Sequence, residues 1–157
     1  MLAKEFGRRS PRRSYLKSVI RLSCWTGGII ASSLSLATYV MRGSVISKLT
    51  PDAQVRVACL SIFPAVLVCQ AFKGLAYPAN GVVMGGSDWT FSLLTMGFAN
   101  VVATSALAAL GFGGRTVSLQ SIWWSLAAFM LTQVVASFTR VATRTGVWKV
   151  LKANEAS

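Results

Sequence analysis

The sequence has no histidine and only four acidic residues among its 157, and two of those four lie near the termini. A hydrolytic site needs a nucleophile, a base and a group that orients the base. The chain cannot supply such a set, so we expect no enzyme and assign no catalytic residue. The three cysteines, Cys24, Cys59 and Cys69, lie in apolar runs and form no Cys-x-x-Cys pair. We therefore expect no metal site and no cofactor.

Charge is scarce and almost all of one sign. Charged residues make up 13% of the chain, against about 25% in soluble domains, and the net charge is +12. No aromatic residues interleave the N-terminal basic run and no nucleic-acid-binding motif is present, which argues against nucleic acid as a partner. Basic flanks of apolar segments instead set membrane orientation and contact anionic lipid headgroups.

Long apolar runs dominate the rest of the chain. Hydrophobic residues make up 54% of it and the mean hydropathy is +0.57. About 20 apolar residues in a helix span the hydrocarbon core of a bilayer. We predict an all-α, multi-pass membrane protein with membrane lipids as its surroundings. Its parts are a basic cytoplasmic or interfacial segment (1–21), a four-helix transmembrane region (22–139, with spans at about 22–41, 57–87, 89–114 and 116–139) and a basic cytoplasmic tail (140–157).

Four spans place both termini on the same side of the membrane. Seven Lys/Arg residues precede Leu22 and four more follow the last apolar run, whereas four lie in the two opposite loops. The positive-inside rule then predicts cytoplasmic (or stromal) termini. The basic N-terminal stretch is also rich in Arg and Ser like a transit peptide, but an interfacial connector is the preferred interpretation. In the 42–56 connector, Thr50 is expected as a helix N-cap and Pro51 at the first helical position.

The second apolar segment is interrupted by the stretch QAFKGLAYPANGVVMGGSD, residues 70–88. Its polar and special residues recur every three or four positions, which places them on one helix face. A charge near the bilayer centre is unfavourable by about 2.5 to 3.5 kcal/mol. This face should therefore line a bundle interior or an aqueous cavity, and the candidate substrate or ion residues on it are Gln70, Lys73, Tyr77 and Asn80.

Prolines and glycines in the same segment predict a helix break and close packing. Pro64 and Pro78 each remove a backbone donor, and Gly81 and Gly85 form a Gly-x-x-x-Gly pair that lets another helix approach. The alternative is a kinked structural helix whose polar groups bond to neighbouring helices and whose lysine reaches toward an interface. The acidic residues at predicted helix ends, Asp52 and Asp88, are expected to act as caps.

These features together resemble the last third of the multidrug and toxic compound extrusion (MATE) transporters. LAKEFGRRSPRRSYLKSVIRL resembles the family's basic connector before its ninth helix, and NGVVMGGSD resembles the glycine-rich end of its tenth helix. The resemblance covers about residues 2–152 and is greatest to the plastid-type plant and algal branch. It implies an antiporter that exports organic solutes or xenobiotics against an inward H⁺ or Na⁺ gradient by alternating access, in a plastid membrane.

Two departures from the family pattern bear on mechanism. Many members carry an acidic residue before the first glycine of the tenth-helix motif, where this chain has Asn80. An asparagine does not exchange a proton near neutral pH, which puts coupling through this position in doubt. Family members also have about twelve helices in two lobes, and this chain supplies four.

The leading hypothesis is therefore a C-terminal fragment of a MATE-type antiporter that needs the remaining helices of the fold as partners. It is either a truncated or incompletely predicted gene product, or a chain that assembles with the missing parts in trans. The alternative is a small four-helix membrane subunit that scaffolds or regulates a larger membrane complex. An open reading frame upstream with about eight further apolar segments would favour the fragment, and a stop codon and promoter there would favour the subunit.

Overall fold

A computed structural model describes residues 4, 6, 12–111 and 117–152 of the chain. Four long helices follow one another: α2 (Arg13–Leu49), α3 (Ala53–Gly85), α4 (Trp89–Gly111) and α5 (Leu119–Thr143), with a short 3₁₀ helix, η1 (Gly146–Leu151), at the end. All four long helices are long and apolar enough to cross a membrane. The expected all-α architecture with four transmembrane helices is confirmed.

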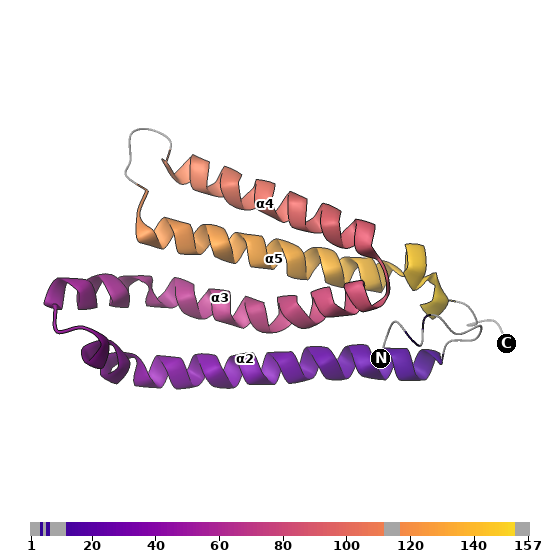
Figure 1. Ribbon diagram of the computed structural model, residues 1–157, viewed down its shortest axis with the longest axis horizontal. Coiled ribbons are helices and arrows are strands. Elements are labelled where there is room, and N and C mark those ends of the chain that lie inside the picture. Colours follow the sequence, from indigo (N-terminus) through magenta and orange to yellow (C-terminus); the bar gives the residue numbers. More distant parts are fainter. Residues whose placement is uncertain (1–3, 5, 7–11, 112–116, 153–157) are drawn as a thin grey trace.

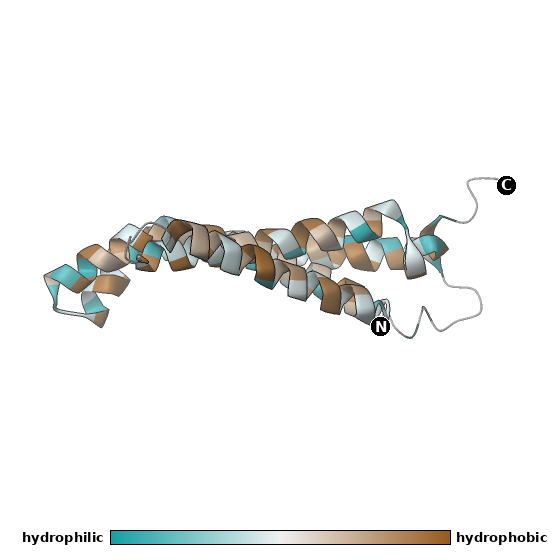
Figure 2. Ribbon diagram, turned by 90° about the horizontal axis from the view of Figure 1, so that it is seen from above, coloured by the Kyte–Doolittle hydropathy of each residue, from teal (hydrophilic) through white to brown (hydrophobic). Residues whose placement is uncertain are grey.

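The four helices lie side by side in one thin layer, in the order α2, α3, α5, α4 (Figure 1). Seen from above, the layer is thin, and polar residues gather at the turn between α2 and α3 (Figure 2). Both faces of the layer therefore remain open. Large apolar side chains on these faces, such as Trp25, Leu34, Leu93 and Phe98, are more than half exposed. In a bilayer, lipid or further helices would cover them.

The first helix is longer than the sequence predicted. It begins at Arg13 rather than Leu22 and ends at Leu49 rather than Met41. Its 37 residues reach roughly 55 Å, well beyond a hydrocarbon core of about 30 Å. Part of the expected interfacial segment and most of the expected 42–56 connector are thus helical extensions of a transmembrane span, and the connector shrinks to residues 50–52.

The start of α3 corrects a capping prediction. Asp52, not Thr50, is the N-cap: its Oδ1 accepts hydrogen bonds from the backbone N–H groups of Gln54 (2.7 Å) and Val55 (3.4 Å). Pro51 therefore lies outside the helix, and Thr50 instead accepts from the Asp52 N–H through its hydroxyl at 3.2 Å. A carboxylate satisfies the first free N–H groups and interacts favourably with the helix dipole.

Helix α3 runs unbroken through Pro64 and Pro78, so the predicted helix break is wrong. A proline removes one hydrogen bond and crowds the preceding turn. Here α2 packs along one side of α3 and α5 along the other (Figure 1), and α3 stays helical through both prolines.

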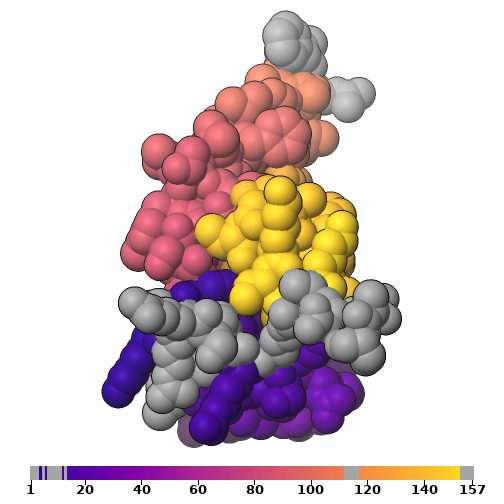
Figure 3. Space-filling view, turned by 90° about the vertical axis from the view of Figure 1, so that its right-hand side faces the viewer, coloured from indigo at the N-terminus to yellow at the C-terminus, as the bar shows by residue number. Residues whose placement is uncertain are grey.

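The C-terminal region is more ordered than the expected tail. Arg140 belongs to α5, and η1 folds back so that Trp148 is fully buried. It packs in a cluster with Leu16 of α2, Val82 of α3 and Leu151. Figure 3, viewed from this end, shows the C-terminal residues in yellow lying above α2. The start of α2 and the end of α5 therefore meet at one end of the layer. Residues 153–157 and 112–116, which include parts of the predicted tail and of the third and fourth spans, lie outside the described residues.

Candidate functional site

Small residues bring α2 and α3 into backbone contact. A Cβ added at Gly74 would overlap the Cβ of Ala31 and lie 2.9 Å from the carbonyl oxygen of Gly27. A Cβ added at Gly27 would overlap the Gly74 carbonyl and lie 2.5 Å from the Pro78 ring. Such contacts are typical of transmembrane helix pairs with small residues four apart. Sequence reasoning missed Gly27 and Ala31, although their spacing carried this signal.

A groove follows this crossing along α3. It has a volume of about 480 Å³, and its floor carries Gln70, Lys73 and Tyr77. Ile30, Ala31 and Leu34 of α2 form one wall, and Trp123 of α5 borders the other side. Three of the four predicted cavity residues are thus brought together. Trp123 is a fourth contributor that the sequence did not single out.

Lys73 is the only charged residue among those that line the groove. It lies twelve positions before the end of α3 at Gly85, roughly 18 Å along the helix, which is close to half the thickness of a hydrocarbon core of about 30 Å. The acidic residues that the structure describes are Asp52, which caps α3, and Asp88, which pairs with Arg140. No described carboxylate therefore neutralises Lys73.

Asn80 lies apart from this groove. Its amide nitrogen donates to Oε1 of Gln133 on α5 at 3.5 Å, and Gln133 is buried. About three turns earlier along α3, the Cys69 thiol donates to the Trp123 carbonyl oxygen at 3.3 Å. The polar face of α3 thus divides: Gln70, Lys73 and Tyr77 remain open to the groove, while Asn80 contributes to the contact with α5.

The predicted packing glycines behave differently from one another. A Cβ at Gly81 would meet no atom within 4 Å in the described part of the molecule, so Gly81 does not mediate the packing of these helices. Gly85 is the last residue of α3. Gly86, next in the chain, has a Cβ position 2.8 Å from the Trp148 ring. The close approach predicted for this glycine-rich turn thus occurs at Gly86, against η1.

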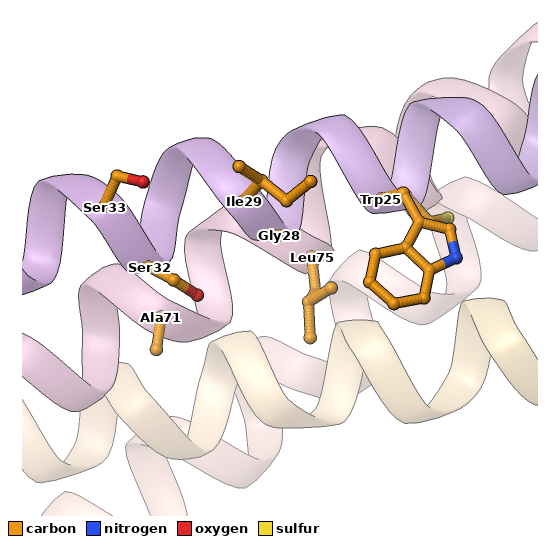
Figure 4. Close-up of a pocket in the computed structure, with 8 residues that line it drawn as sticks. Trp25, Gly28, Ile29, Ser32, Ser33, Ala71 and Leu75 are labelled. Atoms are coloured by element: carbon orange, nitrogen blue, oxygen red, sulfur yellow. The ribbon is translucent and has the colours of Figure 1, made fainter.

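A second hollow of about 590 Å³ lies along the same α2–α3 pair. Figure 4 shows Trp25 and Ile29 of α2 around it, with Leu75 and Ala71 of α3. Its polar atoms include the hydroxyls of Ser32 and Ser33, and no charged side chain lines it. This hollow suits an apolar occupant, whereas the groove with Lys73 suits a polar or anionic one.

An ion pair at the end of the layer was also missed. Asp88 was expected to cap a helix, but its carboxylate accepts from Nε of Arg140 at 2.8 Å and from a terminal guanidinium nitrogen at 3.3 Å. Arg140 also donates to the Thr145 hydroxyl at 2.9 Å and stacks over the Phe91 ring at 4.8 Å. Opposite charges 52 positions apart gave no local signal of this pairing. The pair ties the α3–α4 turn to the end of α5.

Comparison with known proteins bears on the resemblance to MATE transporters. The chain is 29% identical to the Arabidopsis thaliana protein DETOXIFICATION 44, chloroplastic, over 92% of its own length and 26% of the relative's. It is 29% identical to Arabidopsis DETOXIFICATION 43 over 60% of its length and 17% of that relative's. The chain is a homologue of the DETOXIFICATION (MATE) proteins.

The similarity to MATE proteins predicted from the sequence is therefore confirmed. A third relative, DETOXIFICATION 42, is 28% identical over 57% of the chain. The chain spans about a quarter or less of the length of these relatives. No protein-family model matches the chain, and no solved structure matches it significantly.

Proposed function

We propose that this chain supplies four helices of a MATE-type secondary antiporter that exports organic solutes, coupled to H⁺ or Na⁺. The observation that carries the proposal is the groove along α3, which Gln70, Lys73 and Tyr77 line, on a helix that is long and apolar enough to cross a membrane. Polar groups inside a membrane mark substrate or ion pathways because lipid cannot solvate them. The similarity to DETOXIFICATION proteins supports the same assignment.

The charge of the groove favours an anionic group on the solute. An ammonium in a low-dielectric site needs a counter-ion or water, and no described carboxylate provides the counter-ion. Gln70 and Tyr77 add hydrogen-bonding groups beside Lys73, and Trp123 adds an aromatic surface. We assign Lys73 the role of binding a carboxylate or other anionic group of the solute, with the remaining helices of a MATE-like fold closing the open face of the groove.

Transport by proteoliposomes tests this assignment. The chain is expressed within a protein of its relatives' length, and efflux of one anionic and one cationic organic solute is measured under imposed H⁺ and Na⁺ gradients. Lys73→Met should reduce transport of the anion at least tenfold, and Lys73→Arg should retain most of it. Lys48→Met, which removes an exposed cation at the far end of α2, is the control. Unchanged transport of both solutes by Lys73→Met would remove Lys73 from the mechanism.

Solvent access to the groove is tested separately. In a background without native cysteines, Lys73→Cys and Tyr77→Cys should react with a membrane-impermeant thiol reagent, because both positions line the groove. Leu94→Cys on α4 is exposed on a helix face outside the groove and should react only slowly. Equal protection of all three positions from both sides of the membrane would contradict a water-filled pathway.

The alternative, a subunit that scaffolds a larger complex, rests on a different observation. Cβ atoms at Gly81 and Gly97 would meet nothing within 4 Å in the described structure, so both glycines are available to a partner helix. The missing MATE helices would use the same faces. If the chain copurifies with an unrelated membrane complex and Lys73→Met leaves transport intact, the subunit hypothesis is favoured.

A further inference from the structure

We propose that the end of the layer where α2, α5 and η1 meet binds one anionic glycerophospholipid in a defined position. The site begins in a hollow of about 410 Å³ whose lining includes three cations: Lys17 and Arg21 of α2 and Arg144 at the end of α5. The inference does not depend on the transport activity proposed above.

The headgroup end is built for negative charge. Lys17 and Arg21 are four residues apart, so they lie on the same face of α2. Arg144 reaches the hollow from the opposite wall and has a left-handed backbone, φ 52° and ψ 43°. Arg144 is the C-cap of α5, and a left-handed residue is a common way for a helix to end. No carboxylate lies among the described residues that line the hollow.

The hollow continues into an apolar one. Cys24 and Trp25 line both the basic hollow and the hollow of about 590 Å³ between α2 and α3. Beyond Trp25 the walls become Ile29, Ala71 and Leu75 (Figure 4). The basic hollow is therefore joined to the apolar hollow at the indole ring of Trp25. This is the order of groups along a phospholipid, from phosphate through glycerol to acyl chain.

The length of the combined site fits one leaflet. Lys17 and Ser33 mark its two ends on α2, and 16 residues of helix rise roughly 24 Å. Half of a bilayer with its headgroup region is about 20 to 22 Å thick. A lipid with its phosphate at Lys17, Arg21 and Arg144 would therefore place its chain end near Ser32. Free phosphate would use only the basic end.

Native mass spectrometry and lipid exchange in nanodiscs test the proposal. The 157-residue chain is reconstituted in phosphatidylcholine containing a small fraction of phosphatidylglycerol, and the phosphatidylglycerol retained after delipidation is measured. A cation near the membrane surface contributes about fivefold in affinity. Lys17→Gln/Arg21→Gln should thus reduce retention about 25-fold. Lys149→Gln/Lys152→Gln removes the same charge at the same end from exposed residues that do not line the hollow, and should change retention less than threefold.

Arg144→Gly tests the contribution of the Arg144 charge to lipid binding while the backbone conformation at this position is kept. Glycine accepts the left-handed conformation, so the end of α5 should keep its backbone in this variant, which should retain about fivefold less phosphatidylglycerol. Equal losses in the site and control variants would show a general charge effect and overturn the proposal. Displacement of the lipid by millimolar inorganic phosphate, or by glycerophosphoglycerol without acyl chains, would identify an anion site and overturn the lipid assignment.

Discussion

The contact between α2 and α3 at Gly74 offers a sharp test of the packing. In Gly74→Ala the new methyl group would overlap Ala31 and approach the Gly27 carbonyl oxygen to 2.9 Å. Ordinary carbon contacts are about 3.5 to 4.0 Å, so the helices must separate locally. Overpacking of this kind costs about 1 to 3 kcal/mol. Glycine-to-alanine substitution within a helix recovers at most about 1 kcal/mol.

The same helix contains a matched control. Gly81→Ala makes the same chemical change seven residues later, where the added methyl group meets no atom within 4 Å. The helix-propensity gain is common to both variants and cancels in their difference. Gly74→Ala should therefore be less stable than Gly81→Ala by about 1 to 3 kcal/mol, measured by SDS titration in mixed micelles and followed by far-UV circular dichroism.

A rescue variant identifies the responsible contact. Ala31→Gly removes the methyl group that the new side chain would overlap, so Ala31→Gly/Gly74→Ala should recover at least half of the lost stability. If Gly74→Ala and Gly81→Ala are equally stable, the two helices do not cross at these residues. The position of α2 as a wall of the groove around Lys73 would then be wrong as well.

Two further predictions concern the ends of the helices. Asp88→Asn should destabilise the chain by about 2 kcal/mol, less than the 3 to 5 kcal/mol typical of a broken buried pair because the Arg140 side chain is 24% exposed. In a double-mutant cycle by SDS titration, Arg140→Met should restore part of that stability, and strict additivity would show that the pair does not couple the two segments. Asp52→Ala should cost about 1 kcal/mol through the lost cap, whereas Asp52→Asn should be nearly neutral. An equal loss in both variants would show that the charge, and not the hydrogen bonds, stabilises the start of α3.

Local sequence signals located the helices because lipid allows few alternatives. In hydrocarbon every backbone polar group must be satisfied within the segment, so an apolar run of about 20 residues has to be a helix. The same signals did not predict where the first helix begins and ends. Polar residues at 13–21 and 42–49 suggested connectors, yet a helix can continue beyond its apolar part once it is begun, and α2 includes both stretches.

The three-to-four-residue spacing on the second apolar segment pointed to three of the residues that line the candidate groove. Gln70, Lys73 and Tyr77 share one face of α3 whatever packs against it, and their clustering follows from helix geometry alone. Helix geometry does not determine which neighbouring helix each residue of that face contacts. Asn80 lies on the same face, but it contacts Gln133 because α5 packs against that end of α3.

The amino-acid sequence by itself thus determined an all-helical membrane chain, its four spans and the polar face of the second, because these depend on interactions between near neighbours and on the thickness of a bilayer. Only the tertiary structure decided that Gly27 meets Gly74, that Asp88 pairs with Arg140 and that Trp148 is buried against Leu16. These contacts join segments that are far apart along the chain. Their formation depends on how whole helices pack, and helical periodicity carries no information about which face of one helix will meet which face of another.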